Sequence, residues 1–289
     1  MIAPGVRLWF ATDAILRRLR PTRLRVAARS VVGGAWMGAG SERWRDEVDE
    51  EVYARRYAYH DTDEHNLRGL FEWEAAAIAS SFPSAGRVLI TSAGGGREVI
   101  ALRRAGYEPV GTECHPVLRQ RAVDLLTRSG LEASVVRAER DRVGEVSGPF
   151  DAAIVGWGAY TNIRGTRRRR AFLQELVAHL APGAPVLLSF FARDGDPRRF
   201  RWLSGVGGTV AGLLGREPVE VGDVLDPTWQ HYFRREELEA ELASAGLRLE
   251  RWVRTPYAHA IARVPGDLSA RPPVRDSSVT PLVGRRGTR

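Results

Sequence analysis

Residues 87–113 constrain the fold of this 289-residue chain more than any other segment. The apolar run 88–90 suits a strand buried on both faces of a parallel sheet, and three consecutive glycines follow it at 94–96. The glycines predict a sharp turn into a helix, and the next strand ends at Glu113. Because a carboxylate can accept hydrogen bonds from two ribose hydroxyls, this order of elements predicts an α/β fold with the front half of a nucleotide-cofactor site.

The spacing of the glycines bears on which cofactor the turn would hold. A dinucleotide-binding fingerprint requires Gly-x-Gly-x-x-Gly; Gly94 and Gly96 fit its first two places, but Val99 stands in the third. This counts against NAD and leaves an NAD-type oxidoreductase as an alternative. A phosphate-binding P-loop is excluded, because it needs a lysine and the chain contains none.

The strand, the glycine turn and the acidic residue resemble the first motif of the class I S-adenosylmethionine-dependent methyltransferases, and the match extends to about residue 264. The resemblance implies a Rossmann-like three-layer sandwich around a mostly parallel seven-stranded sheet with an antiparallel closing strand, and it implies S-adenosylmethionine as the cofactor. It also implies methyl transfer as the activity. A noncatalytic relative of these enzymes is a further alternative.

The resemblance assigns cofactor contacts to the ends of the first two strands. The residues implied to face the methionine part of the cofactor are Ala93, Gly94, Gly95 and Gly96, and Glu113 is implied to bind the ribose. Two positions depart from the motif, because Ile90 stands where an acidic residue is usual and Ser92 replaces the first glycine. We therefore expect the amino-acid end of the cofactor to be held differently or more weakly.

Two further residues are candidates for the cofactor site. In the resembled family an acidic residue after the third strand binds the adenine amino group, and Glu139 fits that spacing slightly better than Asp141. The alternative is an ordinary surface carboxylate. Trp157 follows the expected fourth strand and could pack on adenine or substrate, or belong to the core.

Catalysis of methyl transfer depends mainly on alignment, because the methyl group leaves by in-line displacement. A general base would help an oxygen nucleophile, and His231 is the first candidate for it, followed by Tyr160. The alternative for each is a hydrogen-bonded structural residue. We expect no metal site, since the single cysteine, Cys114, excludes a multi-cysteine zinc site.

The domain organisation follows from the patterning outside the motif. Residues 41–265 are expected to form one methyltransferase-like domain, with a helical cap at 41–82 and a long irregular insertion at 193–230 that is either a lid or decoration. Residues 266–289 are rich in proline, serine and arginine and suggest an unstructured tail. The basic amphipathic arm 1–40 is either an anchor for anionic membrane or nucleic acid, or a packing arm.

All 43 basic residues are arginine, which indicates coding bias as much as function, so the net charge of +8 is weak support for a nucleic-acid partner. Four arginines at 167–170 open a helix and suit phosphate contacts, but a solvated charge run is the default interpretation. We therefore favour a small-molecule acceptor, such as a secondary metabolite, over RNA. The chain contains no run of about 20 apolar residues, so we expect no membrane-spanning helix. An adenosine cofactor favours a cytoplasmic location.

Overall fold

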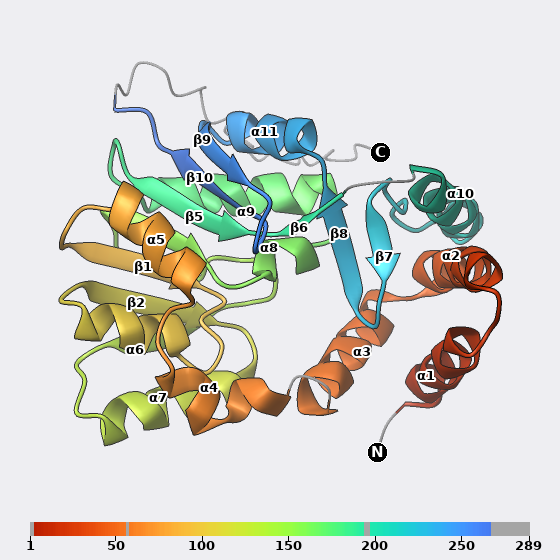
Figure 1. Cartoon of the computed structure of the whole chain (residues 1–289), viewed down its shortest axis with the longest axis horizontal. Coiled ribbons are helices and arrows are strands. Elements are labelled where there is room, and N and C mark those ends of the chain that lie inside the picture. Colours follow the sequence, from red (N-terminus) through yellow and green to blue (C-terminus); the bar gives the residue numbers. More distant parts are fainter. Residues whose placement is uncertain (1–2, 56–57, 194–196, 267–289) are drawn as a thin grey trace, which may run out of the picture.

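The central sheet has seven strands in the order β3-β2-β1-β4-β5-β10-β9 (Figure 1). The computed structural model describes residues 3–55, 58–193 and 197–266. The strands are β1 Arg87–Thr91, β2 Glu108–Glu113, β3 Ser134–Arg137, β4 Ala152–Val155, β5 Pro185–Ser189, β9 Arg248–Val253 and β10 His259–Arg263. Neighbouring strands are parallel except where β10 pairs with β5 and β9, which confirms the expected sheet with its antiparallel closing strand.

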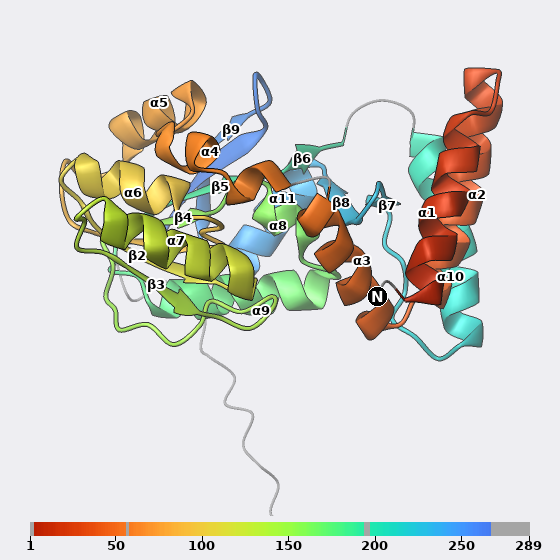
Figure 2. The same ribbon diagram turned by 90° about the horizontal axis from the view of Figure 1, so that it is seen from below.

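Helices cover both faces of this sheet and complete the three layers (Figures 1 and 2). One face carries α5 Glu72–Ser81, α6 Arg97–Arg104 and α7 Pro116–Arg128, and the other carries α9 Thr166–Ala178 and α11 Arg235–Ser244. Strand β1 serves both layers, because Val88 and Ile90 pack under α5–α7 while Leu89 packs under α9 and α11. All three side chains are fully buried, as the apolar run predicted.

The described segment before β1 is mainly helical. Its elements are α1 Pro4–Arg17, α2 Thr22–Ala39, α3 Glu42–Arg55, the short η1 Ala58–Asp61 and α4 Asp63–Leu67. Helices α1 and α2 stand together at one end of the molecule, away from the sheet (Figure 2). Helix α3 leads from them toward the sheet. The cap is therefore tied to the arm 1–40 through α3.

The insertion at 193–230 is not irregular, and that prediction is wrong. Its described residues form α10 Pro197–Leu213 and strands β7 Asp223–Leu225 and β8 Trp229–Phe233, which join β6 Phe191–Ala192 in a small second sheet. Helix α10 packs against α2 at glycines. A Cβ atom added to Gly34 would lie 2.5 Å from the carbonyl oxygen of Leu203, and one on Gly38 would lie 2.3 Å from that of Gly207. Backbone contact between two helices therefore explains these glycines.

Two expectations remain, one about the C-terminal tail and one about membrane-spanning helices. Residues 267–289, the expected tail, lie outside the described residues. Within the part that the structure describes, no helix has both the length and the apolar character needed to cross a bilayer.

Candidate functional site

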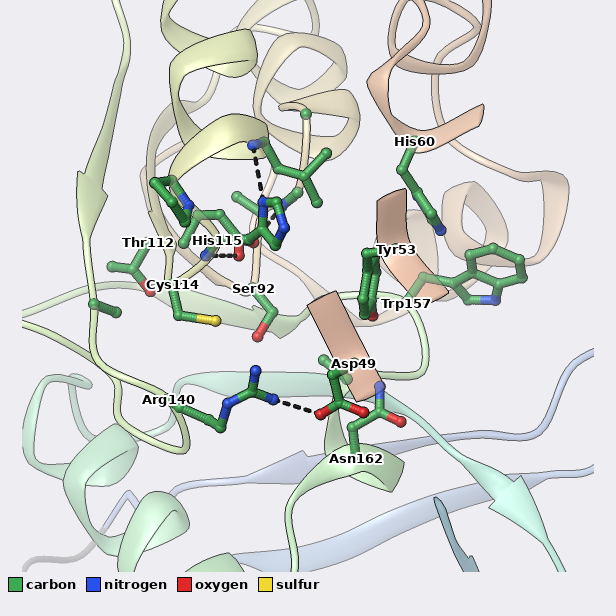
Figure 3. Close-up of a pocket in the computed structure, with 18 of the residues that line it drawn as sticks. Asp49, Tyr53, His60, Ser92, Thr112, Cys114, His115, Arg140, Trp157 and Asn162 are labelled. Atoms are coloured by element: carbon green, nitrogen blue, oxygen red, sulfur yellow. Dashed lines mark hydrogen bonds and ion pairs between the residues drawn. The ribbon is translucent and has the colours of Figure 1, made fainter. Parts of the chain in front are cut away.

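A cavity of about 420 Å³ opens where β1, β2, β3 and β4 end (Figure 3). Parallel strands of this topology bring their carboxyl-terminal loops to one edge of the sheet, which is the usual place for a ligand. The predicted cofactor residues that line the cavity are Ala93, Gly94, Gly95, Glu113, Glu139 and Trp157. Gly96 lies just behind the lining, where it caps the N-terminus of α6. The structure therefore brings almost all of the predicted cofactor residues to one cavity.

The glycine turn after β1 is shaped by left-handed backbone and by a close neighbour. Gly94 and Gly96 have φ angles of +56° and +95°, a region that favours glycine. A Cβ atom on Gly95 would lie 2.4 Å from the side-chain nitrogen of Asn66, which donates hydrogen bonds to the backbone of the cap. Ser92 also has a positive φ, +53°, so the serine at the position of the motif's first glycine adopts left-handed backbone.

Glu113 holds the turn against the end of β2. One carboxylate oxygen accepts the N–H of Gly94 at 2.7 Å, and the other accepts the N–H of His115 at 2.7 Å. The side chain is buried, so both charge-assisted bonds form away from bulk water. A carboxylate has about four acceptor positions, so two remain for the hydroxyls of a ribose.

A buried ion cluster joins the cap to the turn, and the motif comparison did not anticipate it. Arg97 forms bidentate hydrogen bonds to Glu74 of α5, at 2.5 and 2.7 Å, and a further one to Glu98 at 2.6 Å. Burial raises the pKa of Glu74 above its ordinary value despite this pairing. Ile90, which stands where the motif has an acidic residue, is fully buried in the sheet. The charged residues Arg97 and Glu98 at the start of α6 line the cavity beside the turn.

The cavity contains polar atoms that need a partner. The hydroxyl oxygen of Thr112 and the indole nitrogen of Trp157 are buried and have no hydrogen-bond partner among the described residues. Leaving such groups unpaired is costly, so a polar ligand at this position would stabilise the site. The Trp157 ring also lies 5.3 Å from the Phe71 ring and 5.2 Å from the Tyr257 ring. Trp157 therefore belongs to an aromatic cluster and also faces the cavity.

The other end of the cavity is formed by residues that the sequence analysis did not single out. Asp49 and Tyr53 come from α3, and Asn162 comes from the short helix α8 Ala159–Asn162 (Figure 3). Asp49 lies 2.7 Å from Arg140, yet burial raises the pKa of Asp49 to about 6. A carboxyl group with such a pKa is a stronger proton acceptor than an exposed one and is ionised at neutral pH.

His60 also lines this end of the cavity, next to Trp157. Burial, together with the neighbouring His65 and Arg97, lowers the pKa of His60 to about 4. The imidazole is therefore neutral at physiological pH and is a weaker base than Asp49.

The structure places neither predicted base at the cavity. His231 is buried in β8 with its Nδ1 atom 2.7 Å from a carboxylate oxygen of Asp223. Tyr160 is fully buried and donates a 2.6 Å hydrogen bond to Glu241, and burial raises its pKa well above the ordinary value. Both residues are hydrogen-bonded within the protein and neither lines the cavity, so the structure gives no support to a base at either position.

His231 belongs to a cluster whose geometry could also hold a cation. Ligand atoms of Glu220, Asp223 and His231 all lie within 4.8 Å of one another. Arg169 already pairs with Glu220 at 2.8 Å, and His231 pairs with Asp223. The carboxylates thus have partners from the protein itself.

The arginines at 167–170 are only partly solvated, because Arg167 and Arg170 are exposed while Arg169 is buried. Arg169 is buried between Glu220 and Glu241, at 2.8 Å from each. Arg167 and Arg168 pair with Glu217, and Arg168 also pairs with Glu42. Glu217 and Glu220 of the insertion and Glu42 of α3 therefore pair with these arginines, which leaves less positive charge available to bind a phosphate backbone.

Comparison with known proteins supports the fold. No protein-family model matches the chain, and no curated protein matches its sequence. A solved methyltransferase from Methanosarcina mazei, described as S-adenosylmethionine-dependent, aligns with a TM-score of 0.55 and 17% identity over 69% of this chain and all of its own. The chain has the fold of the S-adenosylmethionine-dependent methyltransferases.

Two further solved proteins with this fold are named for small-molecule substrates. An amino pentose methyltransferase of calicheamicin biosynthesis from Micromonospora echinaspora aligns with a TM-score of 0.52 and 17% identity, over 74% of this chain and 96% of its own. The 1,6-didemethyltoxoflavin N1-methyltransferase of Burkholderia thailandensis aligns with a TM-score of 0.54 and 18% identity, over 76% of this chain and 87% of its own.

Proposed function

We propose that this protein transfers the methyl group of S-adenosylmethionine to a small molecule. The observation that carries the proposal is the buried carboxylate of Glu113, bonded to the N–H of Gly94 at the mouth of a cavity of about 420 Å³. The unpaired polar atoms of Thr112 and Trp157 in the same cavity support a polar ligand there. The shared fold supports the choice of cofactor.

Four groups would hold the cofactor. Glu113 would accept the ribose hydroxyls, and the backbone at 93–95 would face the methionine part. Glu139, which is exposed at the edge of the cavity, would accept the adenine amino group, and Trp157 would contact the adenosine. When bound, the cofactor supplies a methyl group on a sulfonium that is transferred by in-line displacement.

The acceptor would lie between α3 and the loop after β4. Asp49 is the side chain best suited to take up the proton that an attacking nitrogen or oxygen must release, because it lines the cavity and its pKa is about 6. Tyr53 and Asn162 would orient the acceptor from either side of Asp49. Residues of α3 line this end of the cavity, whose volume of about 420 Å³ suits a small molecule. The small-molecule substrates named for two neighbours agree with this.

Calorimetric titration of the purified protein tests the proposal. We expect saturable binding of S-adenosylmethionine and S-adenosylhomocysteine and no binding of NAD. Binding of NAD alone would indicate an oxidoreductase, and binding of none of the three would indicate a noncatalytic protein. Mass spectrometry of amine- and hydroxyl-bearing small molecules incubated with the protein and labelled cofactor would then identify the acceptor, with the Asp49→Asn variant as the comparison.

A further inference from the structure

A second cavity, of about 220 Å³, lies beside the first and is lined by different residues. Four arginines line it: Arg45, Arg164, Arg167 and Arg168. Trp229 of β8 forms another wall. This volume is several times the roughly 30 Å³ that one water molecule occupies in the liquid, so the cavity has room for a polyatomic ligand.

Three buried hydrogen-bond donors on residues that line this cavity lack partners among the described residues. They are Nε of Arg45, one terminal nitrogen of Arg164 and the indole nitrogen of Trp229. All three residues are buried, with 7%, 6% and 5% of their surfaces exposed. Proteins rarely leave buried donors unpaired, because each costs free energy. Three such donors around one cavity point to a ligand that carries acceptors.

The buried arginine side chains at this cavity carry positive charge, which also favours an anion. The guanidinium carbons of Arg45 and Arg164 lie 4.2 and 5.9 Å from the centre of the Trp229 ring, so two cations share one aromatic wall. Burial and the charge of Arg164 lower the pKa of Arg45 to about 10, and burial and the charge of Arg168 lower the pKa of Arg164. Negative charge between these two side chains would relieve their repulsion.

The carboxylates at the cavity wall do not pair with Arg45 or Arg164. Glu220 accepts the N–H of Thr166 and a hydrogen bond from Arg169, while Glu217 pairs with Arg167 and Arg168. The carboxylate nearest to Arg164 in an ion pair is Glu42, and its oxygen lies 4.0 Å away. That distance is too long for a hydrogen bond. Among the described residues, the guanidinium group of Arg45 donates one hydrogen bond, to the carbonyl oxygen of Met37 at 2.9 Å, so the protein provides few acceptors for Arg45 and Arg164.

We propose that this cavity binds a small oxyanion, with inorganic phosphate as the simplest form. The guanidinium groups of Arg45 and Arg164 would bind the oxygens of the anion, and the indole N–H of Trp229 would donate a third hydrogen bond. The anion is either free or the terminal group of a larger molecule. This site does not depend on the proposed methyl transfer.

Thermal unfolding of the full chain tests this site with inorganic phosphate as the probe. Phosphate is titrated against sodium chloride of equal ionic strength. We expect a saturable rise in Tm with phosphate and none with chloride. A parallel titration with glycerol 3-phosphate distinguishes the sources: a rise with both probes supports a terminal phosphate, and a rise with phosphate alone supports the free ion. The absence of a saturable rise with either probe would overturn the proposal.

Two variants and a matched control connect the effect to the cavity. Arg164→Gln should weaken phosphate binding by about tenfold or more, because it removes a charged donor. Trp229→Phe keeps the aromatic wall, removes only the third donor and should also weaken binding. The control is Arg43→Gln, since Arg43 is on the same helix as Arg45 but is 89% exposed and pairs with Glu47 at 3.0 Å. If both cavity variants respond to phosphate as the control does, the effect is an adventitious ion only.

Discussion

The replacement Glu113→Gln should weaken both the fold and the cofactor site, and the structure gives the size of each effect. The two carboxylate oxygens accept the N–H groups of Gly94 and His115, each at 2.7 Å. A glutamine has only one side-chain oxygen, so it can keep one of these bonds, while its NH₂ group would face the other N–H. Losing one hydrogen bond to a buried charge should lower the free energy of unfolding by about 1.5–3 kcal/mol.

The effect on cofactor binding is separate. If Glu113 accepts ribose hydroxyls, the loss of its charge should cost a further 1.5–3 kcal/mol or so of binding free energy, which raises the Kd for S-adenosylmethionine roughly 10- to 150-fold. Denaturant unfolding without cofactor measures the first effect, and calorimetry at a temperature where the variant is folded measures the second.

A matched variant, Glu132→Gln, separates these effects from a simple loss of negative charge. Glu132 is exposed just before β3 and does not line the cavity. We expect it to change neither quantity. A normal Kd in Glu113→Gln would show that the carboxylate does not bind the ribose, and unchanged stability would show that the bonds to the glycine turn contribute little.

Three further replacements test the rest of the site. Because burial raises the pKa of Asp49 to about 6, the wild-type rate should fall as the pH drops below about 6 and the carboxylate takes up a proton; Asp49→Asn should lower kcat by about 10²–10⁴-fold and lose this acid limb in a pH–rate profile. Gly95→Ala should destabilise the protein by about 1–3 kcal/mol in denaturant unfolding, because its Cβ would lie 2.4 Å from the side-chain nitrogen of Asn66, and Asn66→Ala should restore part of the loss in a double-mutant cycle. Tyr160→Phe should lower stability by about 1–3 kcal/mol through the lost bond to Glu241 but leave kcat unchanged, and a large fall in kcat with normal stability would return Tyr160 to the list of catalytic candidates.

The sheet was predictable because its central strands β1, β4 and β5 are short, mainly apolar and buried on both faces. Leu89 packs on one side of β1 while Val88 and Ile90 pack on the other, so no polar residue is tolerated along the run. The position of the candidate cofactor site could be predicted from the same local pattern, because the glycine turn and Glu113 lie at the ends of the adjacent strands β1 and β2. The cofactor roles given to residues 93–96, Glu113, Glu139 and Trp157 remain predictions, although all of these residues except Gly96 line the cavity.

The insertion was not predictable from local sequence. Glycine disfavours helix by about 1 kcal/mol relative to alanine, so the glycine-rich segment 205–215 indicated an irregular loop. Helix α10 forms because Gly207 meets Gly34 and Gly38 of α2, nearly 170 residues earlier in the chain. Tertiary packing that needs small residues on both partners leaves no signal within either segment alone.

The candidate base was missed for a related reason. His231 was chosen by residue type and by its place before the last helix, with Tyr160 second. Each is buried against a carboxylate, Asp223 of the neighbouring strand β7 for His231 and Glu241 of α11 for Tyr160. Asp49 lies in a highly charged helix, where one more carboxylate carries no distinguishing pattern. Its burial and raised pKa arise only when α3 packs over the ends of the strands.

Helix α3 contributes residues to both cavities, so the helices outside the methyltransferase-like sheet affect both sites. Asp49 faces the larger cavity and Arg45 the smaller one, and the two residues are one helical turn apart. The position of α3 is set at its start by α2, which in turn packs against α10 through glycine contacts. The cofactor residues belong to the sheet and its loops, whereas the acceptor end depends on helices outside it. Changes in the arm or the insertion should therefore alter acceptor binding more than cofactor binding.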